Sequence, residues 1–98
     1  MITIRELIQF IWDKGNFDKN WLKHRVTNRE SEEVFFDKNK KIAEDRFHSG
    51  KEERYIILGK TKGKRLLFIV FTLRGKKVRI ISARDMNKKE RSLYEKAT

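Results

Sequence analysis

Four arginines lie at the ends and margins of the most apolar hairpin in this chain. They are Arg65, Arg74, Arg79 and Arg84. A guanidinium presents its N–H donors in a rigid plane and can hold a phosphate or carboxylate through two parallel hydrogen bonds. Arginines fixed around a core strand pair therefore predict a platform that grips phosphate groups.

The excess positive charge is concentrated in the same part of the chain. The formal net charge of the 98 residues is +11. Residues 60–91 hold 12 Lys and Arg against Asp85 and Glu90, a net of +10, whereas residues 1–59 hold 12 against 11 acidic residues, a net of +1. A localised charge of this size indicates a polyanionic partner, with nucleic acid the first candidate. The lysines near residue 62 could instead serve only to keep sheet edges from pairing.

The composition argues against several classes of protein and site. The chain has no cysteine and only two histidines, which excludes disulfides and cysteine-based zinc sites and makes a metal site improbable. No apolar run approaches the roughly 20 residues of a membrane span. The amino end lacks the layout of a signal peptide. We therefore expect a cytoplasmic protein without metal or cofactor.

The apolar pattern predicts a hairpin at the centre of the fold. Leu66–Leu73 holds seven apolar residues and one threonine, which is typical of a strand buried on both faces. Gly75 stands where a tight turn needs a positive φ. Val78–Ala83 then returns as the second strand. Residues 53–61 predict a further strand, and residues 41–45 predict a weaker one.

Helices are predicted before and after these strands. Residues 17–25 show helical spacing of apolar residues. Residues 27–36 begin with a capping box, in which Thr27 is the N-cap and Glu30 lies three residues further on. A last helix is expected to start at Asp85.

The order of these elements predicts an α+β fold in one domain, residues 1–98. We expect amino-terminal helices, an antiparallel meander of three to four strands and a carboxy-terminal helix, with the helices on one face of the sheet. Residues 1–12 fit either a short helix or an edge strand, and the pattern leaves both open.

Several short motifs occur together in a characteristic order. They are Trp12-Asp13, Asn20 with Lys23-His24, a Glu-rich helix ending Val34-Phe35-Phe36-Asp37, Asp45 with His48, Glu53-Arg54-Tyr55, Gly59, Thr72-Leu73-Arg74-Gly75, Arg79-Ile80-Ile81-Ser82-Ala83-Arg84, and Glu90-Arg91 with Tyr94. Over roughly residues 10–95 this order resembles BrnT-type toxins. Two positions differ: Arg25 stands where the family usually has glycine, and Lys14 stands where it often has proline.

The resemblance implies a fold and an activity. The fold would be RelE-like, and the activity would be RNA cleavage that arrests translation. The chain would be the toxin of a type II toxin–antitoxin pair, neutralised by a BrnA-like antitoxin protein. The substrate implied is RNA, in particular mRNA, and DNA would be contacted only indirectly through the antitoxin complex.

Metal-free RNA cleavage needs a base for the 2′-hydroxyl, cations for the phosphorane charge and an acid for the leaving 5′-oxygen. Arg84 and Arg54 are the candidates for the cationic role, and Arg84 is preferred because it precedes the last helix. Glu53 and His24 are the candidates for proton transfer. Each has a simpler interpretation: Glu53 as an ion-pair partner, and His24 as a helix residue hydrogen-bonded at the core edge. His48, in a loop, is a further candidate that could equally be solvated.

The geometry of the hairpin limits which arginines can act together. With a two-residue turn, Arg79 pairs with Thr72 and Arg84 with Leu67. The two arginines then face opposite sides of the sheet unless a bulge intervenes. Tyr94 could stack on a base or pack at the core edge. The side chains predicted to bind RNA are Lys23, Arg65, Arg74, Lys76, Lys77, Arg79, Lys88, Arg91 and Tyr94.

We therefore predict a metal-independent endoribonuclease toxin. Two alternatives remain open on the sequence alone. The chain could be a non-enzymatic, basic nucleic-acid-binding module, or an interaction subunit whose basic face docks an acidic partner. RNA binding without cleavage would favour the first alternative, and absence of RNA binding would favour the second.

Overall fold

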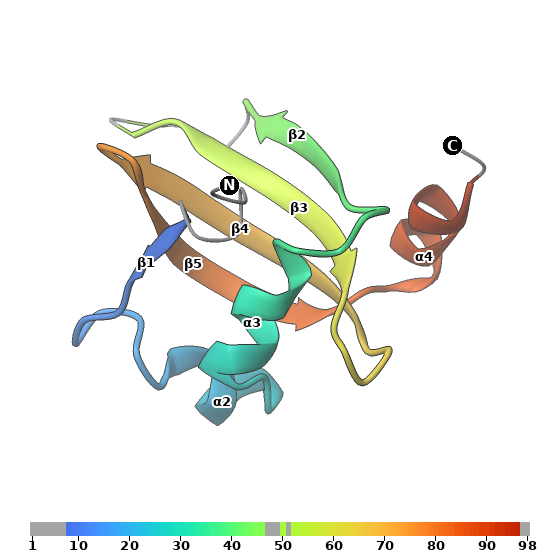
Figure 1. The fold of residues 1–98 in the computed structure, drawn as a ribbon, viewed down its shortest axis with the longest axis horizontal. Coiled ribbons are helices and arrows are strands. Elements are labelled where there is room, and N and C mark those ends of the chain that lie inside the picture. The colour runs from blue at the N-terminus through green and yellow to red at the C-terminus, as the bar shows by residue number, and fades with distance from the viewer. Residues whose placement is uncertain (1–7, 47–49, 51, 97–98) are drawn as a thin grey trace, which may run out of the picture.

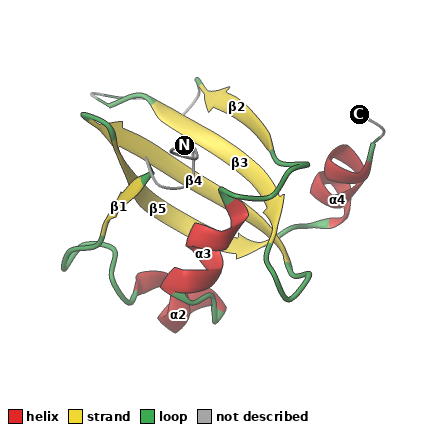
Figure 2. Ribbon diagram, in the orientation of Figure 1, coloured by secondary structure: helices red, strands yellow, loops and turns green. Residues whose placement is uncertain are grey.

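A five-stranded mixed sheet forms the centre of the protein in the computed structural model, which describes residues 8–46, 50 and 52–96 (Figure 1, Figure 2). The spatial order of the strands is β1-β5-β4-β3-β2. The elements are β1 (Gln9–Ile11), α2 (Lys19–His24), α3 (Asn28–Val34), β2 (Lys41–Asp45), β3 (Arg54–Lys60), β4 (Leu66–Arg74), β5 (Lys77–Asp85) and α4 (Lys88–Glu95). None of the described helices is long and apolar enough to cross a membrane.

The sheet combines the predicted meander with one parallel strand. Strands β2 to β5 run antiparallel in sequence order, as predicted. The prediction of a purely antiparallel sheet is wrong, because β1 pairs parallel to β5, with Phe10 opposite Val78. Of the two alternatives for the amino end, residues 9–11 form the edge strand. Residues 1–7, where a helix was the other alternative, lie outside the described residues.

One face of the sheet, which we call the closed face, carries α2 and α3. Val34 and Phe35 of the α3 segment pack in the main core with Ile57 and Leu67 of the sheet. Figure 1 shows α3 crossing in front of the strands. Gly59 permits this approach, because a Cβ at that position would lie 2.5 Å from Cγ1 of Val34.

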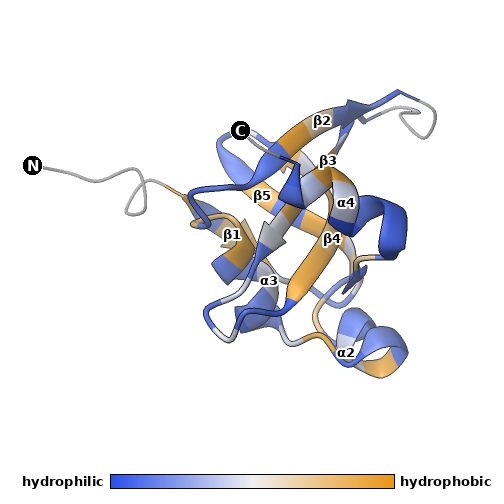
Figure 3. Cartoon of the chain, turned by 90° about the vertical axis from the view of Figure 1, so that its right-hand side faces the viewer, coloured by the Kyte–Doolittle hydropathy of each residue, from blue (hydrophilic) through white to orange (hydrophobic). Residues whose placement is uncertain are grey.

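The opposite face, which we call the open face, carries α4. Tyr94 and Met86 form a second cluster with Leu58, and Leu66 and Phe68 pack against it. Neighbouring strand residues point to opposite faces, so this cluster lies opposite the main core. The expectation that all helices share one face is therefore wrong for α4. In Figure 3 most of α4 is blue while the middle of β4 is orange, so α4 offers few apolar side chains to the sheet.

Two capping boxes set where α3 and α4 begin. The predicted one is confirmed: Oγ1 of Thr27 accepts from the backbone N–H of Glu30 at 3.0 Å, and Oε1 of Glu30 accepts from the backbone N–H of Thr27 at 2.9 Å. A second box joins Asn87 and Glu90 at 2.8 and 2.9 Å. Helix α4 therefore begins at Lys88 rather than at Asp85, which still belongs to β5.

Among the described residues, three chain reversals contain a left-handed backbone, one of them at Lys64, with φ 69°, between β3 and β4. Gly75 has φ +63° in the turn between β4 and β5, as predicted. Arg25 has φ 55° and ψ 37° at the end of α2. Glycine takes this conformation without cost, whereas a residue with a Cβ is strained there. A glycine, which the BrnT-type toxins usually have at the position of Arg25, would adopt the observed backbone without strain.

Candidate phosphate-binding site on the open face

A shallow depression of about 520 Å³ lies in the open face across β2 to β5. The strand register places Asp45 opposite Arg54 and Arg84 opposite Phe68. The depression thereby brings together Arg54 and Arg84, the two predicted catalytic cations. Asp45, only 8% exposed, lies in the same depression. The lining residues are Asp45, Arg54, Ile56, Phe68, Val70, Ile81, Ser82 and Arg84.

A bulge in the β4–β5 hairpin decides which way Arg84 points. Arg79 pairs with Thr72, as the two-residue turn predicts. The register then shifts, so that Arg84 pairs with Phe68 and not, as predicted, with Leu67. Thr72 and Phe68 are an even number of positions apart, so Arg79 and Arg84 both belong to the open face. The sequence pattern contains no signal for this extra residue in β5.

Arg84 is held firmly in place but keeps unused donors. Its Nη1 and Nη2 donate to Oε1 and Oε2 of Glu90 at 2.8 and 2.9 Å, and Nη1 also donates to the carbonyl of Asp85 at 3.1 Å. The guanidinium carbon lies 4.0 Å from the ring centroid of Phe68. Among the described residues, its Nε–H and one hydrogen on Nη2 have no acceptor. The side chain is 35% exposed, so these donors can reach a ligand.

The pair between Arg84 and Glu90 shifts the pKa of both groups. The hydrogen bonds from Arg84 lower the pKa of Glu90, against the effect of burial, and the Glu90 carboxylate raises the pKa of Arg84. The same carboxylate caps α4, so the guanidinium is anchored to a helix terminus. A charged donor that is already positioned is what stabilisation of a developing phosphate charge requires.

The two residues predicted to transfer protons lie elsewhere. Glu53 accepts a hydrogen bond from the hydroxyl of Tyr55 at 2.8 Å, and Tyr55 stacks on Phe71 of the main core, on the closed face. His24 is exposed at the end of α2, so the expectation that it is bonded at the core edge is wrong. Neither Glu53 nor His24 lines the depression. His48 lies outside the described residues.

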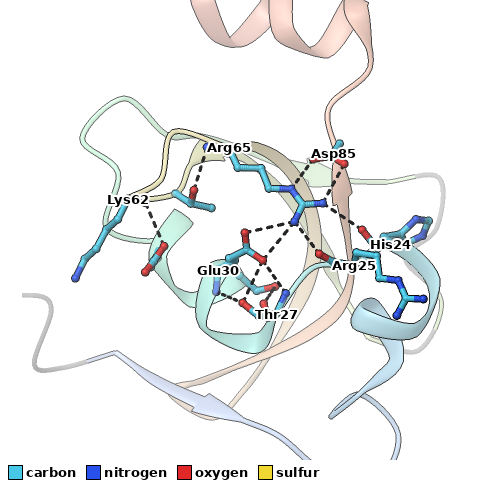
Figure 4. Close-up of polar contacts among 10 residues, drawn as sticks. His24, Arg25, Thr27, Glu30, Lys62, Arg65 and Asp85 are labelled. Atoms are coloured by element: carbon cyan, nitrogen blue, oxygen red, sulfur yellow. Dashed lines mark hydrogen bonds and ion pairs between the residues drawn. The ribbon is translucent and has the colours of Figure 1, made fainter.

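Arg65 ties together four segments of the closed side of the molecule (Figure 4). Its Nε and Nη2 donate to Asp85 at 2.7 and 3.0 Å, and Nη2 also donates to the carbonyl of His24 at 3.1 Å. Its Nη1 donates to the carbonyl of Arg25 at 2.7 Å and to Glu30 at 3.3 Å. Every N–H of this guanidinium is therefore used within the protein, which leaves none for the predicted RNA contact.

The other predicted RNA-binding residues fall into separate groups. At the tip of the hairpin, Arg74 pairs with Glu52 at 3.2 Å and Arg79 with Asp13 at 3.1 Å. The hydrogen bonds from these arginines lower the pKa of Glu52 and of Asp13. The exposed lysines and arginine of the predicted set are Lys76 and Lys77 at the tip, Lys88 and Arg91 on α4, and Lys23 on α2.

Of the two alternatives for Tyr94, stacking on a base or packing at the core edge, the structure shows the packing. Its ring is buried in the cluster under α4, and its hydroxyl donates to Oδ2 of Asp37 at 2.5 Å. Burial raises the pKa of Tyr94, and the bond to Asp37 adds to that effect. Asp37 shows the balance from the other side: burial alone would raise its pKa, but the hydrogen bonds from Tyr94 and from backbone N–H groups lower it. A base cannot stack on this ring in the observed structure.

Two site residues were missed by the sequence reasoning. The sequence motifs include Glu90 without a role for it, although its spacing from Asn87 is a capping-box signal that fixes its position. Asp45 was noticed only within a family motif. Its place beside Arg54 depends on the pairing of β2 with β3, and an isolated acidic residue in a weak strand carries no such signal. The described residues contain no group of three or more His, Cys, Asp or Glu that could hold a metal ion.

Comparison with known proteins gives one family and one fold. Residues 12–90 match the family model described as BrnT, the ribonuclease toxin of a type II toxin–antitoxin system. Among solved structures, the chain resembles the 1.1 Å crystal structure of the ribonuclease toxin BrnT from Brucella abortus, with a TM-score of 0.63 and 19% identity. That match covers 83% of this chain and 99% of the other. No curated protein sequence matches.

Proposed function

The chain belongs to the BrnT family of ribonuclease toxins of type II toxin–antitoxin systems, and from this premise we propose that it cleaves RNA without a metal ion at the depression of the open face. The observation that supports this site most directly is Arg84, which is clamped by Glu90 and Phe68 yet keeps N–H donors directed outward from its internal partners. Arg54 supplies the second cation of the same depression.

The proposed reaction is an internal transesterification. The 2′-oxygen of one ribose attacks the adjacent phosphorus, the bond to the 5′-oxygen of the next nucleotide breaks, and the products carry a 2′,3′-cyclic phosphate and a 5′-hydroxyl. Arg84 and Arg54 would bind the non-bridging oxygens, whose negative charge increases in the transition state. Asp45 would accept the proton of the 2′-hydroxyl, and solvent water would protonate the departing 5′-oxygen.

Glu90 has a different part in this proposal. It is a positioning residue, because it acts through Arg84 and its side chain is only 14% exposed. Two parallel hydrogen bonds fix the plane of the guanidinium, which a single bond would leave free to rotate. Rigid placement lets the donors meet the transition state without reorganisation.

In the cell, cleavage of mRNA in the cytoplasm would arrest translation, and a BrnA-like antitoxin would neutralise the toxin. The family supports an antitoxin partner in general. DNA would be contacted only by the antitoxin within the complex. A relationship of the fold to RelE remains a prediction.

The test is cleavage of a single-stranded RNA in the presence of a chelator. We expect full activity under these conditions and products that end in 2′,3′-cyclic phosphate. Asp45→Asn should reduce the rate by about 10²-fold or more, the usual range for loss of a general base. Glu44→Gln is the matched control, since this neighbouring carboxylate is exposed and, by strand alternation, points to the other face. Activity that needs magnesium or manganese, or full activity of Asp45→Asn, would contradict the mechanism.

A further inference from the structure

An apolar groove of about 540 Å³ runs along the open face between α4 and the edge of the sheet formed by β2 and β3. Ile56, Leu58 and Phe68 contribute to its floor from the sheet, and Leu93 contributes from α4. Leu93 is 48% exposed, although a leucine usually gains from burial. The second cluster stops short of covering this groove, so the apolar surface faces solvent.

The rim of the groove is positively charged. Lys89 and Leu93 lie one turn apart on one side of α4, Lys96 follows the end of that helix, and all three line the groove. Lys41 lies on the opposite rim, where its ammonium donates to the carbonyls of Leu93 and Lys96 at 2.6 and 3.0 Å. The only acidic side chain in the lining is Glu90, and its charge is matched by Arg84.

These features fit a protein segment better than RNA. Single-stranded RNA is usually held by bases that stack on exposed aromatic rings. Phe68 is the aromatic residue of this groove, and its ring already lies under the guanidinium of Arg84. Aliphatic walls with a basic rim instead match the apolar side and the carboxylates of an acidic peptide segment.

The groove is continuous with the proposed cleavage site. Ile56 and Phe68 line both the groove and the depression that holds Arg54 and Arg84. Glu90, which holds Arg84, also lines the groove. A segment seated in the groove would therefore end beside the two arginines and cover them.

We propose that this groove is the docking site for an acidic, amphipathic segment of the antitoxin, whose apolar side chains pack on Leu93 and Ile56 and whose carboxylates meet Lys89 and Lys96. The identification of the partner as the antitoxin rests on the proposed function. Binding here inhibits the toxin by covering Arg84 and Arg54, and it requires no change in the fold of the toxin.

The experiment uses a purified BrnA-like antitoxin, the partner named in the proposed function, and measures its affinity for toxin variants by calorimetry. Leu93→Glu removes an apolar contact and adds a charge that repels acidic side chains. Leu73→Glu is the matched control, because Leu73 is also 48% exposed but lies at the hairpin tip, outside the groove. We expect Leu93→Glu to weaken antitoxin binding by about 10-fold or more, which corresponds to about 1.4 kcal/mol, and Leu73→Glu to bind like the unmodified chain.

RNA cleavage by each variant separates this inference from the proposed function. Loss of antitoxin affinity in Leu93→Glu alone supports the groove, even if the unmodified chain cleaves no RNA, in which case only the proposed function fails. Equal affinity of Leu93→Glu and Leu73→Glu would show that the antitoxin docks elsewhere. Loss of RNA binding in Leu93→Glu with unchanged antitoxin affinity would assign the groove to nucleic acid and overturn the inference.

Discussion

The two faces of the sheet use arginine in opposite ways. On the closed face, Arg65 donates every N–H of its guanidinium to Asp85, Glu30 and two backbone carbonyls. On the open face, Arg84 forms a bidentate pair with Glu90 but keeps donors without an acceptor among the described residues. The exposed fractions of the two side chains, 27% and 35%, hardly differ.

The comparison shows that exposure alone does not distinguish a binding arginine from a structural one. The number of hydrogen-bond acceptors that the protein itself offers to the guanidinium does distinguish them. A guanidinium whose donors are all satisfied inside the protein would have to break existing hydrogen bonds to bind a phosphate, whereas one with spare donors adds new ones. The closed face is thus organised for stability and the open face for ligand contact, and the following predictions test that division.

The largest expected effect is on the two arginines themselves. Arg84→Lys keeps the charge but loses the planar pair of donors, so we expect cleavage to fall by about 10²-fold while the melting temperature stays near that of the unmodified chain. Arg65→Lys should show the reverse, because lysine cannot satisfy Asp85, Glu30 and the carbonyls together. We expect a loss on the order of 2–3 kcal/mol in the free energy of unfolding.

Arg84→Lys and Arg65→Lys are compared by the same two measurements. These are the cleavage rate at a temperature where each variant is folded, and the midpoint of thermal unfolding. If Arg65→Lys loses activity in the folded state, or if Arg84→Lys loses stability and activity together, the division between the faces is wrong.

Gly59→Ala tests the close packing of the closed face. The added Cβ would lie 2.5 Å from Cγ1 and 3.1 Å from the carbonyl oxygen of Val34, so α3 must move away from β3. Overpacking of this kind costs about 1–3 kcal/mol. Gly50→Ala is the control, since a Cβ there meets nothing within 4 Å. Denaturant unfolding of the two variants should separate them clearly, and equal midpoints would show that α3 is not tightly packed.

The pH dependence of stability tests the electrostatics of the open face. The pKa of Glu90 is lowered by Arg84, so this pair contributes its full stability above the ordinary glutamate pKa of about 4.3 and loses it as the pH falls through the lower folded value. Glu90→Gln keeps the capping geometry but removes this contribution. We expect the variant to be less stable at neutral pH and to lose less stability between about pH 5 and pH 3.

The same titration of Glu95→Gln is the control for Glu90→Gln, because Glu95 is an exposed carboxylate of α4. Parallel acid unfolding curves for the unmodified chain and Glu90→Gln would mean that the pair with Arg84 adds nothing to stability.

The smallest effect is expected at the end of α2. Arg25→Gly relieves the left-handed backbone strain, worth on the order of 1 kcal/mol, but it gives up the contact of the guanidinium with the ring of Trp21, 5.2 Å away, and adds freedom to the unfolded chain. We expect a net gain of a few tenths of a kcal/mol. Arg25→Ala loses the contact and keeps the strain, so it should be less stable than Arg25→Gly in thermal unfolding. The opposite order would mean that the ring contact outweighs the strain.

Much of the fold could be predicted from the sequence because its signals are local. The apolar run at Leu66–Leu73, the turn at Gly75 and the capping box at Thr27 each depend on residues a few positions apart, and all three are observed. The parallel strand β1 could not be predicted in this way. A three-residue segment becomes a strand only by hydrogen bonding to the edge of β5, which is distant in the sequence.

The candidate site, like the fold, was predictable only where its signals are local in the sequence. The sequence by itself determined that arginines flank the β4–β5 hairpin and that the excess charge gathers in residues 60–91, because composition and order are properties of the chain. Only the tertiary structure decided which arginine is available. A bulge rotates Arg84 onto the open face, and the pairing of β2 with β3 brings Asp45 beside Arg54. The N–H donors of Arg65 are meanwhile occupied by Asp85 and by carbonyls at the end of α2. Such acceptors surround a donor only when distant segments of the chain pack together.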